Sequence, residues 1–185
     1  MKPTLLFLAF TLISIASCKV EAPVEEKEPI PTVDYDAKLA ELDIQLSEPS
    51  APVANYVNVT QSGNILFLAG KGPNLPEGGY ITGKVGADLT QEEGYEAARL
   101  TGIAQLSVLK AYLGDLNRVK RILKVTGMVN AVPDFGNQPE VINGFSDLMV
   151  EVFGERGKHA RSAVGMGSLP RNIAVEIEII VEVFE

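Results

Sequence analysis

The sequence predicts a single α+β domain in which helices pack on one face of a β-sheet. A capping box at Thr90–Glu93 opens a long segment of helical apolar periodicity. Residues 173–184 alternate apolar and mostly acidic side chains, which is typical of a strand with one buried face. The predicted elements follow the order ββ(β)αβαββ. They form one domain at residues 36–185, because about 150 residues support one core.

The first 17 residues resemble the signal peptide of a bacterial lipoprotein. Lys2 is followed by an apolar run at residues 5–16, which is shorter than the roughly 20 residues that span a bilayer. The run ends in Ile15-Ala16-Ser17-Cys18, which is similar to a lipobox. We therefore expect Cys18 to carry a lipid anchor on a periplasmic or other extracytoplasmic membrane face of the cell envelope. An ordinary signal peptide with an incidental cysteine is the alternative.

An acidic tether and then a hairpin follow the leader. Residues 18–35 are rich in proline and glutamate and poor in large apolar residues, which predicts a solvated linker. Residues 37–42 form a short amphipathic segment. Residues 56–60 and 65–69 are predicted strands, joined by the turn residues Gln61-Ser62-Gly63-Asn64.

A glycine-rich segment at residues 78–86 is predicted to hold one short strand or turn. Gly78 to Lys84 match most of a P-loop. However, Val85 stands where a magnesium-binding serine or threonine is required. We therefore do not expect nucleotide binding.

Two helices and three strands complete the domain. The first helix ends near Gly114, and the second spans residues 139–153 with a proline at its first position. Residues 119–132 form a β-rich run between the helices. The strands at residues 161–166 and 173–184 close the domain.

The last strand predicts two different faces. Its apolar positions should lie under the helices, and they are Val175, Ile177, Ile179, Val181 and Val183. The opposite face carries Glu176 and Glu178, and it meets water, a partner subunit or a ligand. Since Arg161 and Ala163 share a face of the preceding strand, we expect an arginine and a glutamate to lie close together. Such a pair forms either an ion pair or half of an anion-binding site.

Composition excludes several functions. The net charge of −8 argues against binding of nucleic acid, because phosphates are neutralised by clustered Lys and Arg. With one histidine and one cysteine, we expect no metal site. A serine triad would need His159 as its base, and no nucleophile elbow accompanies it.

A series of ordered motifs runs from about residue 55 to residue 184. Its first members are Asn55-Tyr56-Val57, Leu68-Ala69-Gly70, Gly72-Pro73, Gly83-Lys84-Val85-Gly86 and Asn143. It ends in His159-Ala160-Arg161-Ser162-Ala163-Val164, Ser168-Leu169-Pro170 and Ala174-Val175-Glu176-Ile177-Glu178. Together these motifs resemble the RidA/YjgF family of reactive-intermediate deaminases.

The resemblance implies a chorismate-mutase-like α+β fold that assembles as a homotrimer with clefts between subunits. It also implies hydrolysis of reactive 2-imino acids, or of their enamine tautomers, to 2-keto acids and ammonia without a cofactor. By the same resemblance, Arg161 binds the substrate carboxylate and Glu176 positions or deprotonates the attacking water. Tyr56 lines the cleft, Asn143 binds substrate, and the Ala163 carbonyl holds the imine nitrogen or water.

Two residues depart from the well-studied members of the family. Ala163 replaces a common cysteine, whose thiol the family mechanism does not need as a nucleophile. His159 replaces a proline, and either adds a proton donor or caps a strand. Two functions therefore remain open. One is a 2-imino acid deaminase, and the other is a non-catalytic trimeric module that binds small carboxylates or another envelope protein.

Overall fold

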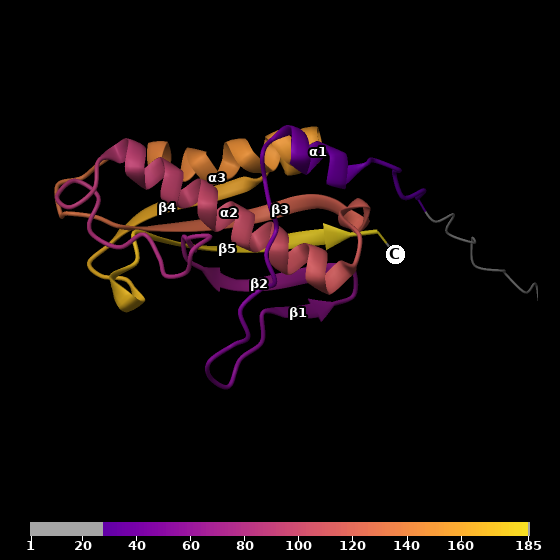
Figure 1. Cartoon of the computed structure of the whole chain (residues 1–185), viewed down its shortest axis with the longest axis horizontal. Helices are drawn as coiled ribbons and strands as arrows, with labels where there is room; N and C mark the ends of the chain where they lie inside the picture. The colour runs from indigo at the N-terminus through magenta and orange to yellow at the C-terminus, as the bar shows by residue number, and fades with distance from the viewer. Residues whose placement is uncertain (1–27, 185) are drawn as a thin grey trace, which may run out of the picture.

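The computed structural model describes residues 28–184, and Figure 1 shows their arrangement. The predicted leader, Cys18 and most of the tether lie outside the described residues. The helices are α1 Tyr35–Glu41, α2 Gln91–Leu113 and α3 Gln138–Phe153, with 3-10 turns η1 Leu116–Arg118, η2 Gly154–Gly157 and η3 Pro170–Asn172. The strands are β1 Val59–Ser62, β2 Ile65–Lys71, β3 Val119–Asn130, β4 Ala160–Met166 and β5 Val175–Val183.

The five strands form one mixed sheet in the order β1-β2-β5-β3-β4. Neighbours are antiparallel except β3 and β4, which run parallel. The parallel pair is possible because α3 carries the chain back between those two strands. The predicted α+β class, with two long helices on one face of a mixed sheet, is confirmed.

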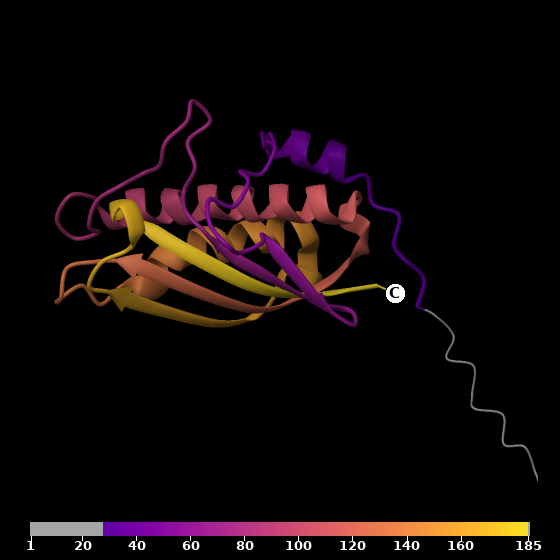
Figure 2. The same ribbon diagram turned by 90° about the horizontal axis from the view of Figure 1, so that it is seen from below.

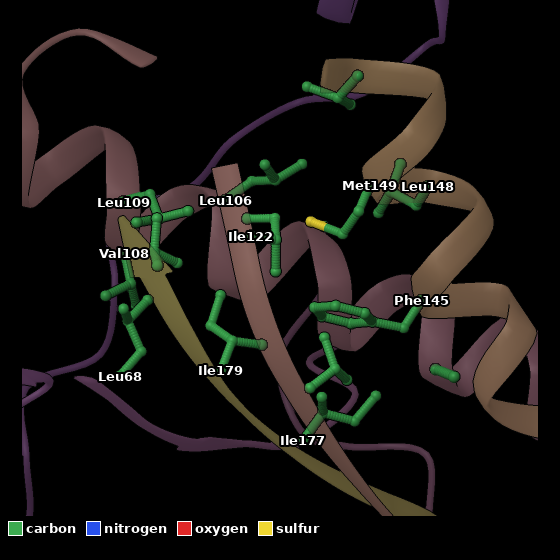
Figure 3. Close-up of a cluster of buried hydrophobic side chains, with 14 of the residues drawn as sticks. Leu68, Leu106, Val108, Leu109, Ile122, Phe145, Leu148, Met149, Ile177 and Ile179 are labelled. Atoms are coloured by element: carbon green, nitrogen blue, oxygen red, sulfur yellow. The ribbon is translucent and has the colours of Figure 1, made fainter. Parts of the chain in front are cut away.

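The helices cover only one face of the sheet, as Figure 2 shows. The predicted alternation of β5 is confirmed, since Val175, Ile177, Ile179, Val181 and Val183 are all buried. In Figure 3, Ile177 and Ile179 of this strand lie among apolar side chains of both long helices, including Leu106, Leu109, Phe145 and Met149. Burial of each such side chain contributes about 1.5–3 kcal/mol. The opposite face of the sheet is covered by no helix among residues 28–184.

Local signals fix the ends of α2. The Thr90 hydroxyl accepts a hydrogen bond from the Glu93 backbone, and the Glu93 carboxylate accepts one from the Thr90 backbone. This capping box is the one predicted from the sequence. Gly114 ends the helix at φ 76°, a left-handed conformation that favours glycine.

Several elements differ from the sequence predictions, and three of these differences bear on the fold. β1 begins at Val59 rather than Tyr56, because the chain turns at Tyr56, whose N–H bonds to the Ala54 carbonyl. Residues 78–86 contain isolated bridges and no strand. Tyr35, the last residue of the predicted tether, begins α1 and is buried against Phe153.

No helix within residues 28–184 has the length and apolar character needed to cross a membrane.

Candidate active site

Arg161 and Glu176 do not meet within one chain. β3 lies between their strands, so β4 and β5 are not neighbours. Arg161 aligns with Val125 of β3 on the helix-covered face. Glu176 alternates with buried residues of β5 and therefore lies on the open face. The expected close pair is thus wrong for a single subunit, because sequence order does not reveal the inserted strand.

Arg161 is held against α3 by one nitrogen of its guanidinium. Its Nη1 donates to Asn143 Oδ1 at 2.9 Å and to Ser146 Oγ at 3.0 Å. Asn143 and Ser146 are three residues apart, so one helix face presents both acceptors. Among the described residues, no group bonds to Nε or Nη2. These two nitrogens form an edge that matches the two oxygens of a carboxylate.

His159 lies behind this arginine and is linked to it through Ser146. Its Nε2 is 3.0 Å from Ser146 Oγ, and its Nδ1 is 2.7 Å from the Gly157 carbonyl oxygen. Burial lowers the pKa of His159, and the charge of Arg161 lowers it further, against the opposing effect of the Gly157 carbonyl. The imidazole is therefore neutral near pH 7. Ala163 follows on the same strand face as Arg161 and is partly buried against the core.

Glu176 and Tyr56 line a separate hollow of about 300 Å³ on the other side of the sheet. The Glu176 carboxylate rests on Gly70, where a Cβ atom would lie 2.3 Å from Oε1. A side chain at position 70 would therefore displace this carboxylate from its observed position. Burial raises the pKa of Glu176, and the neighbouring charge of Glu178 raises it further. A carboxylate with a raised pKa is a stronger base than an exposed one.

Two cations in this hollow were missed by the sequence analysis. Lys71 and Arg171 line it together with Tyr80. Burial lowers the pKa of Lys71, whose Nζ donates to Asn58 Oδ1 at 2.6 Å. Arg171 packs over the Tyr80 ring and donates to its hydroxyl. Its position directly after Leu169-Pro170 of the family signature was the available signal.

Other candidate sites are occupied by structural interactions or lack chemistry. Lys84 of the P-loop-like segment donates to Asn130 Oδ1 and to the Gly167 carbonyl, so it ties its segment to the end of β3 and to the chain just after β4. A larger hollow of about 590 Å³ lies at the start of α2 and contains none of the predicted site residues. Within residues 28–184, no cluster of three or more possible metal ligands exists.

Comparison with known proteins identifies the family. The model of the family described as "YjgF/chorismate mutase-like, putative endoribonuclease" matches residues 36–183. The chain is 46% identical to Protein TCP17 of Trypanosoma cruzi over 147 residues, which are 79% of this chain and 92% of that protein. It therefore belongs to the YjgF/RidA-like family.

Solved structures agree with this assignment. The protein Atu1372 of Agrobacterium tumefaciens, whose function is unknown, is 43% identical, with a TM-score of 0.75 over 80% of this chain and 93% of that one. A protein of Shewanella oneidensis MR-1, described as a "putative endoribonuclease", is 31% identical, with a TM-score of 0.77 over 80% and 99% of the two chains.

Proposed function

We propose that this protein hydrolyses reactive 2-imino acids, or their enamine tautomers, to 2-keto acids and ammonia. The reaction would take place in clefts between the subunits of a homotrimer. The observation that carries the proposal is the division of the site into two half-sites. Arg161 presents an unbonded edge on one face, and half-buried Glu176 lies in a hollow on the other. A second copy of the chain is needed to bring the two together.

The open face of the sheet supports the homotrimer. It exposes apolar side chains, including 45% of Phe67 and 42% of Val164. Ile180 is paired with Phe67 across the two strands and extends the same surface. Apolar area of this kind is usual where subunits associate.

In the proposed mechanism, Arg161 binds the substrate carboxylate and leaves the imine carbon facing Glu176. Glu176 takes a proton from water as the oxygen bonds to that carbon. Glu176 returns that proton to the nitrogen, which gives a carbinolamine. The hydroxyl proton then passes through Glu176 to the nitrogen as the carbon–nitrogen bond breaks, which leaves the 2-keto acid and ammonia. Because imines are already electrophilic, orientation and this proton transfer suffice. No cofactor takes part.

The test supplies the full chain with a 2-imino acid generated in situ by an amino-acid oxidase. We expect the wild type to accelerate loss of the imine over a buffer blank. Arg161→Ala should remove most of the gain, and Arg161→Lys should restore little because an ammonium cannot hold both carboxylate oxygens in one plane. Glu176→Gln should retain binding of a keto acid and slow turnover by roughly 10²–10⁴.

Two matched variants serve as controls. Glu178→Gln changes an exposed carboxylate two residues from Glu176 on the same strand face, and it should retain most activity at neutral pH. Arg171→Ala removes the arginine that shares the hollow with Glu176. If Arg171→Ala abolishes carboxylate binding and Arg161→Ala does not, the assignment of Arg161 is wrong.

The second candidate function is non-catalytic binding. In this case the protein is a trimeric module that binds either small carboxylates or another envelope protein. The unbonded edge of Arg161 favours carboxylate binding, because it needs no contribution from Glu176. A wild type that matches the blank while it binds a 2-keto acid through Arg161 would establish this function instead. RNA is the less favoured ligand, since the net charge is −8.

The cellular location of the protein forms a further part of the proposal. We propose that Cys18 carries a lipid anchor that holds the domain at an extracytoplasmic membrane face. The similarity of residues 15–18 to a lipobox supports this. Incorporation of radiolabelled palmitate into the wild type but not into Cys18→Ser tests it. Absence of label from the wild type would contradict the proposed lipid anchor.

A further inference from the structure

The hydrogen bonds around Ser146 have only one consistent direction. Arg161 has donors and no acceptor, so Ser146 Oγ must accept the bond from Nη1. The single hydroxyl proton of Ser146 is then available for His159 Nε2, which must be the acceptor. The Gly157 carbonyl can only accept, so Nδ1 of His159 carries the ring proton. A neutral imidazole satisfies every one of these bonds.

Protonation of His159 would disrupt this arrangement of hydrogen bonds. With hydrogens on both ring nitrogens, Nε2 becomes a donor toward Ser146 Oγ. The hydroxyl would then accept from His159 and Arg161 together, while its own proton loses its partner. Two positive charges would also share one oxygen. The neutral form of His159 therefore favours the observed position of the guanidinium.

We propose that Ser146 and His159 are positioning residues for Arg161. They form a hydrogen-bonded chain from the Gly157 carbonyl to Nη1, which holds the Nε and Nη2 edge ready for a monocarboxylate ligand. This inference rests on the proposed binding of a carboxylate by Arg161, and it does not depend on catalysis. Neither residue needs to touch the ligand, because each acts through Arg161.

The chain also couples ligand binding to the charge of His159. The guanidinium position that offers its Nε and Nη2 edge to a carboxylate depends on a neutral imidazole. Binding to that position should therefore lower the pKa of His159, and by linkage the carboxylate should bind less tightly as the pH falls through that pKa.

The other groups packed near His159 do not oppose this coupling. Phe145 of α3 contributes an uncharged ring edge, and Gly157 of η2 contributes a carbonyl. The adjacent Lys158 is paired with Glu155 at 2.6 Å. Among the described residues, the charge that acts on His159 is that of Arg161.

Nuclear magnetic resonance of the imidazole tests the first step. His159 is the only histidine in the sequence, so a chain without a histidine tag gives one set of ring signals. The nitrogen chemical shifts should show a neutral ring protonated on Nδ1. On addition of pyruvate, the pKa of His159 should fall. A neutral ring protonated on Nε2 would overturn the proposal, as would pyruvate binding with no change in the titration.

Variants of Ser146 and His159 test the second step through the dissociation constant of pyruvate. Ser146→Ala should weaken binding about tenfold, by loss of a hydrogen bond to a charged group, and Ser146→Thr should restore most of it. His159→Gln can still accept from Ser146 but does not titrate, so the pH dependence of binding should disappear. Ser162→Ala is the matched control. Ser162 also lies on β4, but its side chain points to the face opposite Arg161, where its hydroxyl accepts a hydrogen bond from Lys124 of β3.

The outcomes separate this inference from the proposed function. Wild-type binding of pyruvate without imine hydrolysis overturns the deaminase and leaves the positioning chain intact. Equal binding by wild type and Ser146→Ala overturns the positioning chain whatever the activity. Wild type that binds no pyruvate overturns both the role of Arg161 and this inference.

Discussion

At the scale of single residues, the environment of Glu176 sets the pH range in which it can act as a base. Its ordinary pKa of 4.5 is raised by burial and by Glu178. Because the base must be deprotonated, imine hydrolysis should be lost as the pH falls through this raised pKa. We expect the acidic limb of kcat/KM to lie above pH 4.5, and Glu178→Gln to move it to lower pH. A pH–rate profile of both proteins provides the measurement.

The Glu178→Gln variant also tests whether Glu176 controls the acidic limb of the pH–rate profile. Glu178→Gln removes a charge without changing the volume of the side chain, so the fold and the neutral-pH rate should be preserved. An acidic limb that is identical in wild type and Glu178→Gln would mean that a different group controls it.

At the residue level, sequence motifs indicated candidate site residues, whereas contacts between distant segments could not be predicted. The roles of Arg161, Glu176 and Tyr56 stay predictions, and the structure places Tyr56 and Glu176 in one hollow and Arg161 on the other face of the sheet. Ser146 was missed because a serine on a helix surface has no distinctive pattern. Its partnership with His159 depends on how η2 and β4 return past α3, which local sequence does not encode.

At the scale of elements, the crossing of α2 and α3 depends on Gly144. A Cβ atom there would lie 2.0 Å from the Tyr95 carbonyl oxygen and 3.2 Å from the Arg99 nitrogen. Since both are backbone atoms, no side-chain rotation relieves the clash. Gly144→Ala should reduce the free energy of unfolding by about 1–3 kcal/mol through separation of the helices. Chemical denaturation measures this change.

Gly136 offers the matched control. It is exposed, and a Cβ atom there meets nothing within 4 Å. Gly136→Ala should therefore leave the unfolding midpoint nearly unchanged. Equal losses in both variants would indicate a general cost of removing glycine rather than a close approach of helices.

Element type was easier to predict than element order. The capping box of α2 and the alternation of β5 are local signals, and both were confirmed. The position of β5 between β2 and β3 is set by long-range pairing, such as Val125 with Ile179. The start of β1 was also predicted too early, because Tyr56 and Val57 have strong β-propensity and yet lie outside the sheet.

At the scale of the whole molecule, the opposite placement of Arg161 and Glu176 predicts complementation between subunits. Arg161→Ala and Glu176→Gln should each be inactive alone. When the two are co-expressed and assemble at random, about a quarter of the clefts receive both native residues. The mixed protein should therefore recover about a quarter of wild-type kcat. An imine-hydrolysis assay on the purified mixture measures the recovery.

Mixing the two variants after separate purification gives the control, because assembled subunits should exchange slowly. Recovery that requires co-expression supports a shared cleft. No recovery after co-expression, with mixed assemblies demonstrated by mass spectrometry, would place the working site within one chain.

The central position of β5 has a consequence for the order in which the protein is made. β5 comes last among the described strands and yet contacts β2 on one side and β3 on the other. During synthesis, the hairpin of β1 and β2 therefore emerges long before the strand that joins it to β3 and β4. Until residues 175–183 leave the ribosome, the sheet consists of two unconnected parts with exposed edges. The nascent chain should thus stay open to chaperones, or to a translocation channel, until β5 has been synthesised.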